Sequence, residues 1–230
     1  MIRNMKNALI PIMLLLLTLF SCEKKEEFVY EYETNPQYTW GYAEFYGAWY
    51  ADYGVENNVL SLYAFTDSLL VNDESQLYGF GQQLFLEDIF LTPADTFFVE
   101  GVYQVSNSRE AFTIAPGEEF EEEGKKTDVG AYIIYYEKND SYSIRKFIVD
   151  GSMTVAQVGG YTRFDFDFIL DDDTELKGRY DQLDLNYYDE SVYPQEVGKQ
   201  KVVLNPMKGF AFEKFKSRPQ YKRGQKNTSK

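Results

Sequence analysis

The stretch that decides the fold is SMTVAQVGGYTRFDFDFILDDDTELKGRYD, residues 152–181. Phenylalanines recur at every second position in its middle, at Phe164, Phe166 and Phe168, and charged residues stand between them. In an extended strand this spacing gathers the three rings on one face, whereas a helix would distribute them around its circumference. The pattern predicts a half-buried β-strand over 161–170, with one strand before it and one after it.

Turns and charges predict how these three strands pair. Gly159 and Gly160 supply a two-residue turn that tolerates positive φ, and a three-residue loop at 171–173 keeps the apolar faces of the second and third strands together. The first pairing sets rings against apolar partners, Phe164 opposite Val155 and Phe166 opposite Met153. The second sets opposite charges side by side, Asp167 with Lys177, Asp165 with Arg179 and Arg163 with Asp181. Such pairs stabilise a sheet by about 0.2–1 kcal/mol each, so we interpret these aspartates as structural.

Alternating apolar residues and turn dipeptides extend through residues 40–195, which predicts one all-β domain. We expect a single antiparallel β-barrel or sandwich of about 8–10 strands in meander order, with no long helix. The aromatic content of 17% also favours a sheet. The expected strands are 40–51, 58–66, 78–90, 98–106, 110–115, 129–137, 142–149, 152–158, 161–170 and 174–184.

The first 21 residues have the features of a signal peptide. Residues 1–7 are basic, and residues 8–20 are apolar apart from Thr18, which is too short a run to span a bilayer comfortably. The segment LFSC, residues 19–22, resembles a bacterial lipoprotein signal. That resemblance implies that Cys22, the only cysteine, becomes the first mature residue and carries a covalent lipid. The alternatives are an ordinary cleavage site with a leftover thiol, or an uncleaved anchor.

Residues 22–39 are expected to form a tether between the anchor and the domain. Its start, EKKEE, resembles the surface-export signal that follows the lipidated cysteine in Bacteroidetes lipoproteins, with Lys25, Glu26 and Glu27 in the matching places. The resemblance implies an outer-membrane protein, lipid-anchored and exposed at the cell surface. The alternative is a solvated linker whose charges keep it extended.

Composition excludes several function classes. The chain has no histidine and one cysteine, so it cannot build a Ser-His-Asp or Cys-His nucleophilic site, a His/Cys zinc cage or an intramolecular disulfide. Residues 22–195 hold 11 basic and 35 acidic residues, a net charge of −24. A body this acidic repels polyphosphate, so no nucleic-acid partner is expected.

Residues 196–230 differ from the body, with 10 basic and 2 acidic residues. This tail is poor in branched apolar residues, and we expect it to be disordered. It could contact the acidic body, an acidic partner or an anionic surface polysaccharide, or it could only improve solubility.

Three clusters are candidate sites. Trp40 and Trp49 lie in the aromatic run 38–53 and could stack on sugars, although aromatic strand residues are more often core. Glutamates crowd residues 117–126, which we expect to form a solvated loop. The third cluster could help to bind Ca²⁺, but it lacks EF-hand spacing and also suits a turn; it comprises Asp171, Asp172 and Asp173.

Residues 43–184 resemble a recurrent domain of Bacteroidetes lipoproteins whose members are antiparallel barrels or sandwiches, some of them lipocalin-like or calycin-like. The resemblance rests on EFYGAWYADYG (44–54), GVYQVS (101–106), APGEEF (115–120), GSMTV (151–155) and YTRFDFDFILDDDTELKGRY (161–180). It implies a fold and a habitat, and it brings no catalytic residue.

We therefore expect a non-catalytic binding module for a glycan, a small ligand or a partner protein, with no cofactor beyond the lipid. One alternative is a carboxylate-dependent enzyme acting on polysaccharide, which would need two suitably spaced carboxylates. Another is a structural subunit of an envelope assembly.

Overall fold

The computed structural model describes residues 32–72, 77–122, 124–136, 143–182 and 185–191. These residues belong to one compact unit that begins at Tyr32. Apart from a single 3₁₀ turn at Ala51–Tyr53, its regular elements are strands, and no helix of the described residues has the length and apolarity to cross a membrane. The strands are β1 (Gln37–Gly47), β2 (Val59–Thr66), β3 (Leu69–Val71), β4 (Leu77–Gly79), β5 (Gly81–Phe90), β6 (Gly101–Val105), β7 (Thr113–Ile114), β8 (Glu118–Glu122), β9 (Lys125–Val129), β10 (Ala131–Tyr136), β11 (Ser143–Val158), β12 (Tyr161–Leu170), β13 (Glu175–Gln182) and β14 (Asn186–Asp189).

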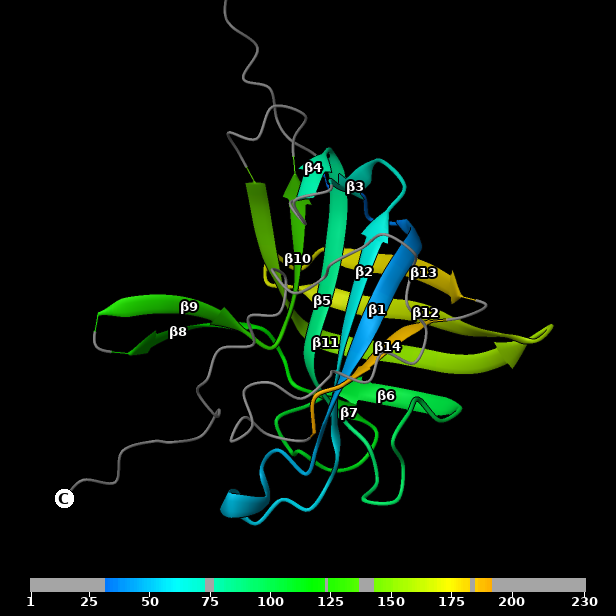
Figure 1. The fold of residues 1–230 in the computed structure, drawn as a ribbon. Helices are drawn as coiled ribbons and strands as arrows, with labels where there is room; N and C mark the ends of the chain where they lie inside the picture. The colour runs from blue at the N-terminus through cyan, green and yellow to red at the C-terminus, as the bar shows by residue number, and fades with distance from the viewer. Residues whose placement is uncertain (1–31, 73–76, 123, 137–142, 183–184, 192–230) are drawn as a thin grey trace, which may run out of the picture. The chain divides into compact units, whose positions relative to one another are not determined.

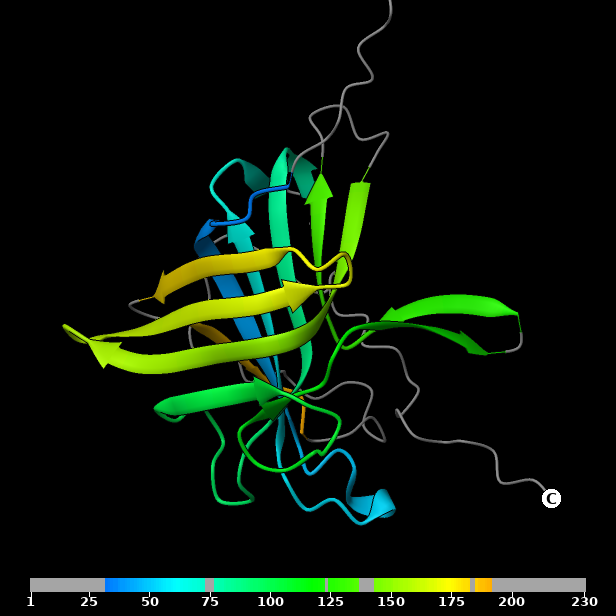
Figure 2. The ribbon, with the colours of Figure 1, turned by 180° about the vertical axis from the view of Figure 1, so that it is seen from behind.

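Eight of these strands close into a barrel. The hydrogen-bonded circuit runs β11-β12-β13-β1-β2-β5-β7-β6 and returns to β11. β10 also bridges β5 and β11, pairing with residues 81–86 of β5 and residues 143–147 of β11. Figures 1 and 2 show the strands from opposite sides of this circuit. The all-β prediction is confirmed, and of its two alternatives the barrel is correct.

The barrel closes through parallel pairs, although an antiparallel sheet was expected. β13 runs parallel to β1, with Gln37 opposite Arg179, and β14 adds a second parallel partner to β1. The reason lies in the strand count. The meander β1-β2-β5-β10-β11-β12-β13 reverses direction at every step, and an odd number of strands brings the last one back parallel to the first.

The barrel interior is filled by side chains, as is usual for a small barrel. Inward-facing positions alternate with outward-facing ones along each strand. Large buried rings in this core include Tyr38, Phe45, Phe98, Tyr103, Phe164, Phe166, Phe168 and Tyr180.

The predicted register of β11, β12 and β13 is confirmed. Phe164 lies opposite Val155 and Phe166 opposite Met153. All three charge pairs are lateral neighbours, with Asp165 opposite Arg179 at the centre. The charge pattern therefore specified the register that the apolar pattern allowed.

Both predicted turns are also present. Gly159 and Gly160 have φ of +60° and +91°, as a two-residue hairpin turn requires. At the next turn the Leu170 N–H donates to the Thr174 carbonyl at 2.9 Å, which closes a three-residue loop. The last loop residue, Asp173, adopts the left-handed conformation typical of such loops, with φ of +65°.

One strand was predicted as two. The expected strands 142–149 and 152–158 form the single long strand β11, with a register shift between Ile148 and Asp150. Gly151, with φ of +106°, follows this irregularity. There β11 exchanges its partner β10 for β6, so a bulge was mistaken for a turn.

Two segments expected to lack regular contacts are ordered by pairing. Residues 117–126, predicted as a loop, contribute to the β8–β9 hairpin, where Lys126 Nζ lies 2.6 Å from Glu119 Oε1. Residues 32–36, assigned to the tether, lie beside β13, because the Lys177 N–H donates to the Thr34 carbonyl at 2.7 Å. Sequence periodicity indicates neither contact. The β8–β9 strands are only five residues long, and residues 32–36 pair with a strand that is distant in the sequence.

Candidate binding surfaces

A row of five aromatic rings crosses the outer face of the barrel. Register aligns one ring from each of β1, β2, β5, β10 and β11, and we call this set the aromatic row: Tyr42, Tyr63, Phe85, Tyr132 and Phe147. Successive ring centroids lie 4.3, 4.4, 5.1 and 6.4 Å apart. The sequence neighbours Leu62 and Leu84 belong to the interior core, so the row faces outward.

The rings of the aromatic row pack against one another. The rings of Tyr42 and Tyr63 are stacked and nearly parallel, with an interplanar angle of 11°, and the ring of Phe85 is tilted by 32° from that of Tyr63. Their faces are therefore engaged within the row, so its outward side consists of ring edges and phenol groups. A sugar stacks on an open ring face, which makes this row a poor glycan platform.

Both tryptophans of the predicted ligand site pack against neighbouring rings. Trp40 stacks on Phe65 with centroids 4.0 Å apart, and its indole N–H donates to the Leu69 carbonyl at 2.8 Å. Trp49 is 7% exposed and packs edge-on to Tyr46. Both side chains have structural contacts, in agreement with the core alternative.

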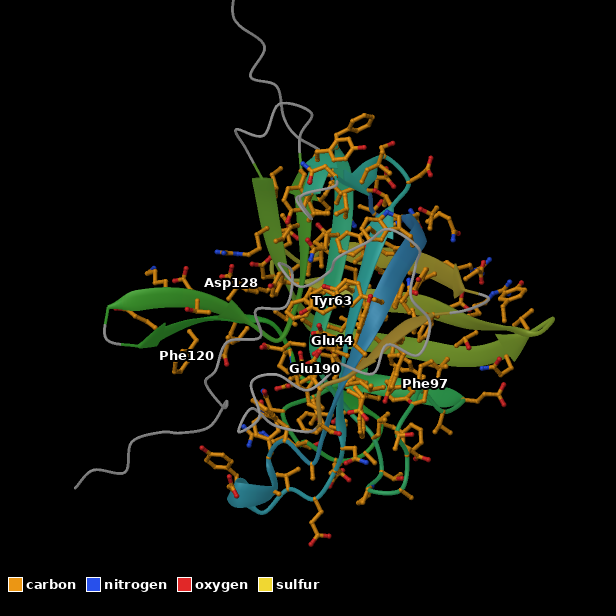
Figure 3. The ribbon with its side chains drawn as sticks, in the orientation of Figure 1. Glu44, Tyr63, Phe97, Phe120, Asp128 and Glu190 are labelled. Atoms are coloured by element: carbon orange, nitrogen blue, oxygen red, sulfur yellow. The ribbon has the colours of Figure 1, made fainter. Side chains whose placement is uncertain are left out.

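Buried carboxylates lie beside the aromatic row. Glu44 is fully buried and accepts a hydrogen bond from the Tyr46 hydroxyl at 2.6 Å. Glu87, 5% exposed, accepts from the Gly130 N–H at 2.7 Å. Glu44 is on β1 and Glu87 is on β5, and β2 lies between these strands. Ser61 of β2 connects the two positions, because it lies opposite Glu44 and its hydroxyl donates to the Glu87 carbonyl. Figure 3 shows Glu44 close to Tyr63 on this face.

The tyrosines around these carboxylates stay protonated at physiological pH. Burial, followed by the charge of Glu44, raises the pKa of Tyr63 well above its usual value. Burial and Glu44 also raise the pKa of Tyr188 to about 12, and burial alone raises that of Tyr136 to about 12. A neutral, buried phenol is not a general base, so this surface suits packing and hydrogen bonding.

The outer face of β12 and β13 is different, because it is exposed and charged. Arg163 Nε lies 2.7 Å from Asp181 Oδ1, and Arg179 Nε lies 2.8 Å from Asp165 Oδ1. Lys177, although opposite Asp167, extends its ammonium to Glu175 of its own strand, 3.0 Å away. The interpretation of these charges as structural agrees with the contacts.

The three aspartates of the β12–β13 loop have separate roles. The Asp172 carboxylate accepts hydrogen bonds from Lys146 Nζ at 2.9 Å and the Tyr32 hydroxyl at 2.7 Å. Desolvation opposes ionisation, but these hydrogen bonds outweigh it and hold the pKa of Asp172 well below its usual range. Asp171 donates its N–H to the Phe147 carbonyl, while Asp173 takes the left-handed position. Within the described ranges, no three His, Cys, Asp or Glu side chains are grouped to hold a metal ion.

The β3–β4 hairpin is apolar on both faces. Leu69 packs beneath it in the cluster that contains Tyr42, Tyr63 and Phe85 of the aromatic row. On the opposite face Leu70 pairs with Tyr78, and the Phe80 N–H donates to the Ser68 carbonyl, which places Phe80 in line with them. Leu70, Tyr78 and Phe80 are 44%, 46% and 43% exposed, and we call them the apolar hairpin face. Sequence reasoning missed it because the strands are only three residues long.

Comparison of the chain with protein-family models, with curated proteins and with solved structures finds no match. The predicted anchor and export residues Cys22, Lys25, Glu26 and Glu27 lie outside the described residues, as does the basic tail. The lipoprotein resemblance therefore stays a prediction from sequence.

Proposed function

We propose that this protein is a non-catalytic binding module, held at the outer-membrane surface by a lipid on Cys22, that docks a partner protein of the cell envelope. The observation that carries the proposal is the apolar hairpin face. Three large apolar side chains, each more than 40% exposed, gather on one short hairpin. Grouped exposure of this kind is typical of protein–protein contact sites, whereas single exposed apolar residues are ordinary.

Two features favour a protein as the ligand over a small molecule or a glycan. Side chains fill the barrel interior, where a small ligand would otherwise bind. The ring faces of the aromatic row are paired with one another and not open for sugar stacking. The net charge of −24 over residues 22–195 indicates that the partner's contact surface is apolar with a basic rim.

The test is photo-crosslinking of the full-length protein in the outer membrane, with a crosslinking residue next to the hairpin at Asp67. We expect one stoichiometric envelope protein to be captured by the unmodified hairpin and by the control Val149→Ser. Val149 is 44% exposed but lies on β11. The double variant Leu70→Ser/Tyr78→Ser should lose at least nine-tenths of this adduct. Equal capture by both variants would refute docking at the hairpin.

The anchor is tested separately. Replacing Cys22 by Ser should abolish metabolic labelling with a radioactive fatty acid and release the protein from membranes, since several acyl chains are needed for stable attachment. Labelling that persists in Cys22→Ser would rule out lipidation at this residue.

A further inference from the structure

The outward face of β1, β2 and β5 is aromatic, acidic and buried at the same time, and we call it the outer wall. It carries Tyr42, Tyr63 and Phe85 of the aromatic row together with Glu44 and Glu87. Tyr42 is fully buried and Tyr63 is 6% exposed, values typical of a core although both point away from the interior. A carboxylate with the burial of Glu44 is stabilised by hydrogen bonds and by positive charge. The chemistry that fits this surface is therefore a polypeptide segment with apolar and basic side chains.

Described elements border the outer wall on two sides. β14 lies along β1 and contributes Tyr188, whose ring is edge-on to Tyr42 with centroids 5.8 Å apart. The β3–β4 hairpin contributes Leu69 and Leu77 beside the wall. The chain leaves the described domain at this border, because Glu190 still donates its N–H to the Phe45 carbonyl at 2.7 Å, next to Glu44.

The segment that follows has the matching chemistry. Residues 196–230 hold 10 basic residues against 2 acidic ones. Apolar residues alternate with lysines in its central part, in KVVL (201–204) and KGFAFEKFK (208–216). Cations and aromatic rings of this kind complement buried carboxylates and the edges of aromatic rings.

The segment is also long enough and begins in the right place. The first tail lysine, Lys199, lies eight positions after Ser191, and an extended chain of that length reaches up to about 27 Å. The aromatic row crosses five strands, and four strand spacings amount to about 19 Å. The tail can therefore cross the whole outer wall from its point of exit.

We propose that the C-terminal tail, residues 196–230, binds in cis across the outer wall, with its lysines and arginines beside Glu44 and Glu87 and its phenylalanines against the aromatic row. The tail is then the resident ligand of a second, masked surface, distinct from the apolar hairpin face. The inference is independent of the proposed docking function, since it concerns another face of the barrel and an occupant supplied by the chain itself.

The experiment uses trypsin, because the tail offers eight cleavage sites: Lys230 ends the chain, and Pro219 blocks cleavage after Arg218. The full chain is digested together with a synthetic peptide of residues 196–230, and both are followed by mass spectrometry. In the unmodified protein we expect tail cleavage to be at least tenfold slower than peptide cleavage, and protection should decrease as salt is raised, because salt screens the charge attraction. Cleavage of both at the same rate would overturn the proposal.

Matched variants assign the protection to the outer wall. Glu44→Gln/Glu87→Gln keeps acceptors for Tyr46 and Gly130 but removes two charges, and we expect tail cleavage to approach the peptide rate. The control Glu175→Gln/Asp150→Asn removes two exposed charges from other strands and should retain protection. Undiminished protection in the first variant would overturn the assignment to this wall. Protection that disappears over a dilution of about a hundredfold would indicate a second copy and overturn binding in cis.

A second measurement does not depend on substitutions in the barrel. Replacing the 10 basic tail residues by Gln leaves every described contact intact. Hydroxyl-radical footprinting should then show several-fold more oxidation of Tyr42 and Tyr63, with Phe164 and Phe166 as interior references. Unchanged oxidation of the outer-wall rings would contradict the proposal.

Discussion

The outer face of β2, which belongs to the outer wall, is buried, whereas the outer face of β12 is exposed and charged. On β2 all eight residues are buried, whether they point inward or outward. On β12 the phenylalanines are buried, while the residues between them are partly or fully exposed. Apolar and polar residues alternate along a strand only when water covers one of its faces. The charged face can therefore be predicted from the sequence, whereas the outer wall cannot.

The two faces also contribute differently to stability. Exposed ion pairs such as Arg179–Asp165 contribute about 0–1 kcal/mol each. Buried aromatic contacts such as Tyr42–Tyr63 add about 0.5–1.5 kcal/mol beyond the effect of burial itself. The charged face thus specifies register, whereas the outer wall supplies stability.

Alkaline pH should destabilise the protein in part through the tyrosines of the outer wall and those that border it. Burial raises the pKa of its tyrosines above the value of about 10 in an unfolded chain, so between these values the unfolded state loses a proton that the folded state keeps. The stability present below pH 10 is therefore lost as pH rises, on the order of 1 kcal/mol per tyrosine between pH 10 and pH 11. The tyrosines concerned are Tyr42 and Tyr63 of the outer wall and, beside it, Tyr132, Tyr136 and Tyr188.

Denaturant unfolding from pH 8 to pH 11 measures this loss. Tyr63→Phe should have a shallower pH dependence than the unmodified protein, because one titrating group is gone. Phe85→Leu is the matched control, since it perturbs the same row without changing the number of ionisable groups. Identical pH slopes for all three proteins would show that the wall does not govern alkaline unfolding.

Truncating a ring of the outer wall should cost as much as truncating a core residue. Tyr63→Ala removes a ring that lies between Tyr42 and Phe85, and we expect the free energy of unfolding to fall by about 3–5 kcal/mol. Asp165→Ala, on the outward side of β12, should change it by less than about 1 kcal/mol. Urea midpoints and m-values compare them, and a loss below 1 kcal/mol for Tyr63→Ala would refute the division of roles.

The turn before β12 separates backbone geometry from charge pairing. Gly159 has φ of +60°, so Gly159→Ala should destabilise the protein by about 1–2 kcal/mol. Asn tolerates this conformation, and Gly159→Asn should cost less than half as much. If the two variants are equally stable, the turn does not require a left-handed residue and the charges alone set the register.

The sequence predicted the strands whose two faces differ. Period two in Phe164, Phe166 and Phe168, together with the intervening charges, was enough for the register of three strands, because each alternative register sets like charges together. The turn at Gly159-Gly160 could also be predicted from local sequence, since few residues tolerate positive φ.

The sequence did not predict features that depend on distant partners. Tyr42 and Tyr63 form one row only through the register of β1 and β2, for which the chain has no charge pattern to read. The apolar hairpin face arises because β3 and β4 are too short to show a period. For Trp40 and Trp49 the sequence leaves both a ligand site and core packing open, because composition alone does not distinguish a packed ring from an open one.

The smallest expected effect is the coupling across the charged face. In a double-mutant cycle, Asp165→Ala, Arg179→Ala and the double variant should give a coupling energy of about 0.2–1 kcal/mol. The value should fall in high salt, because both side chains are more than 40% exposed and their attraction is screened. The cycle Asp167/Lys177 serves as a control, since Lys177 contacts Glu175 instead, and we expect a smaller coupling there. A larger coupling for that control pair would mean that lateral position, and not the observed contact, determines how charge stabilises this face.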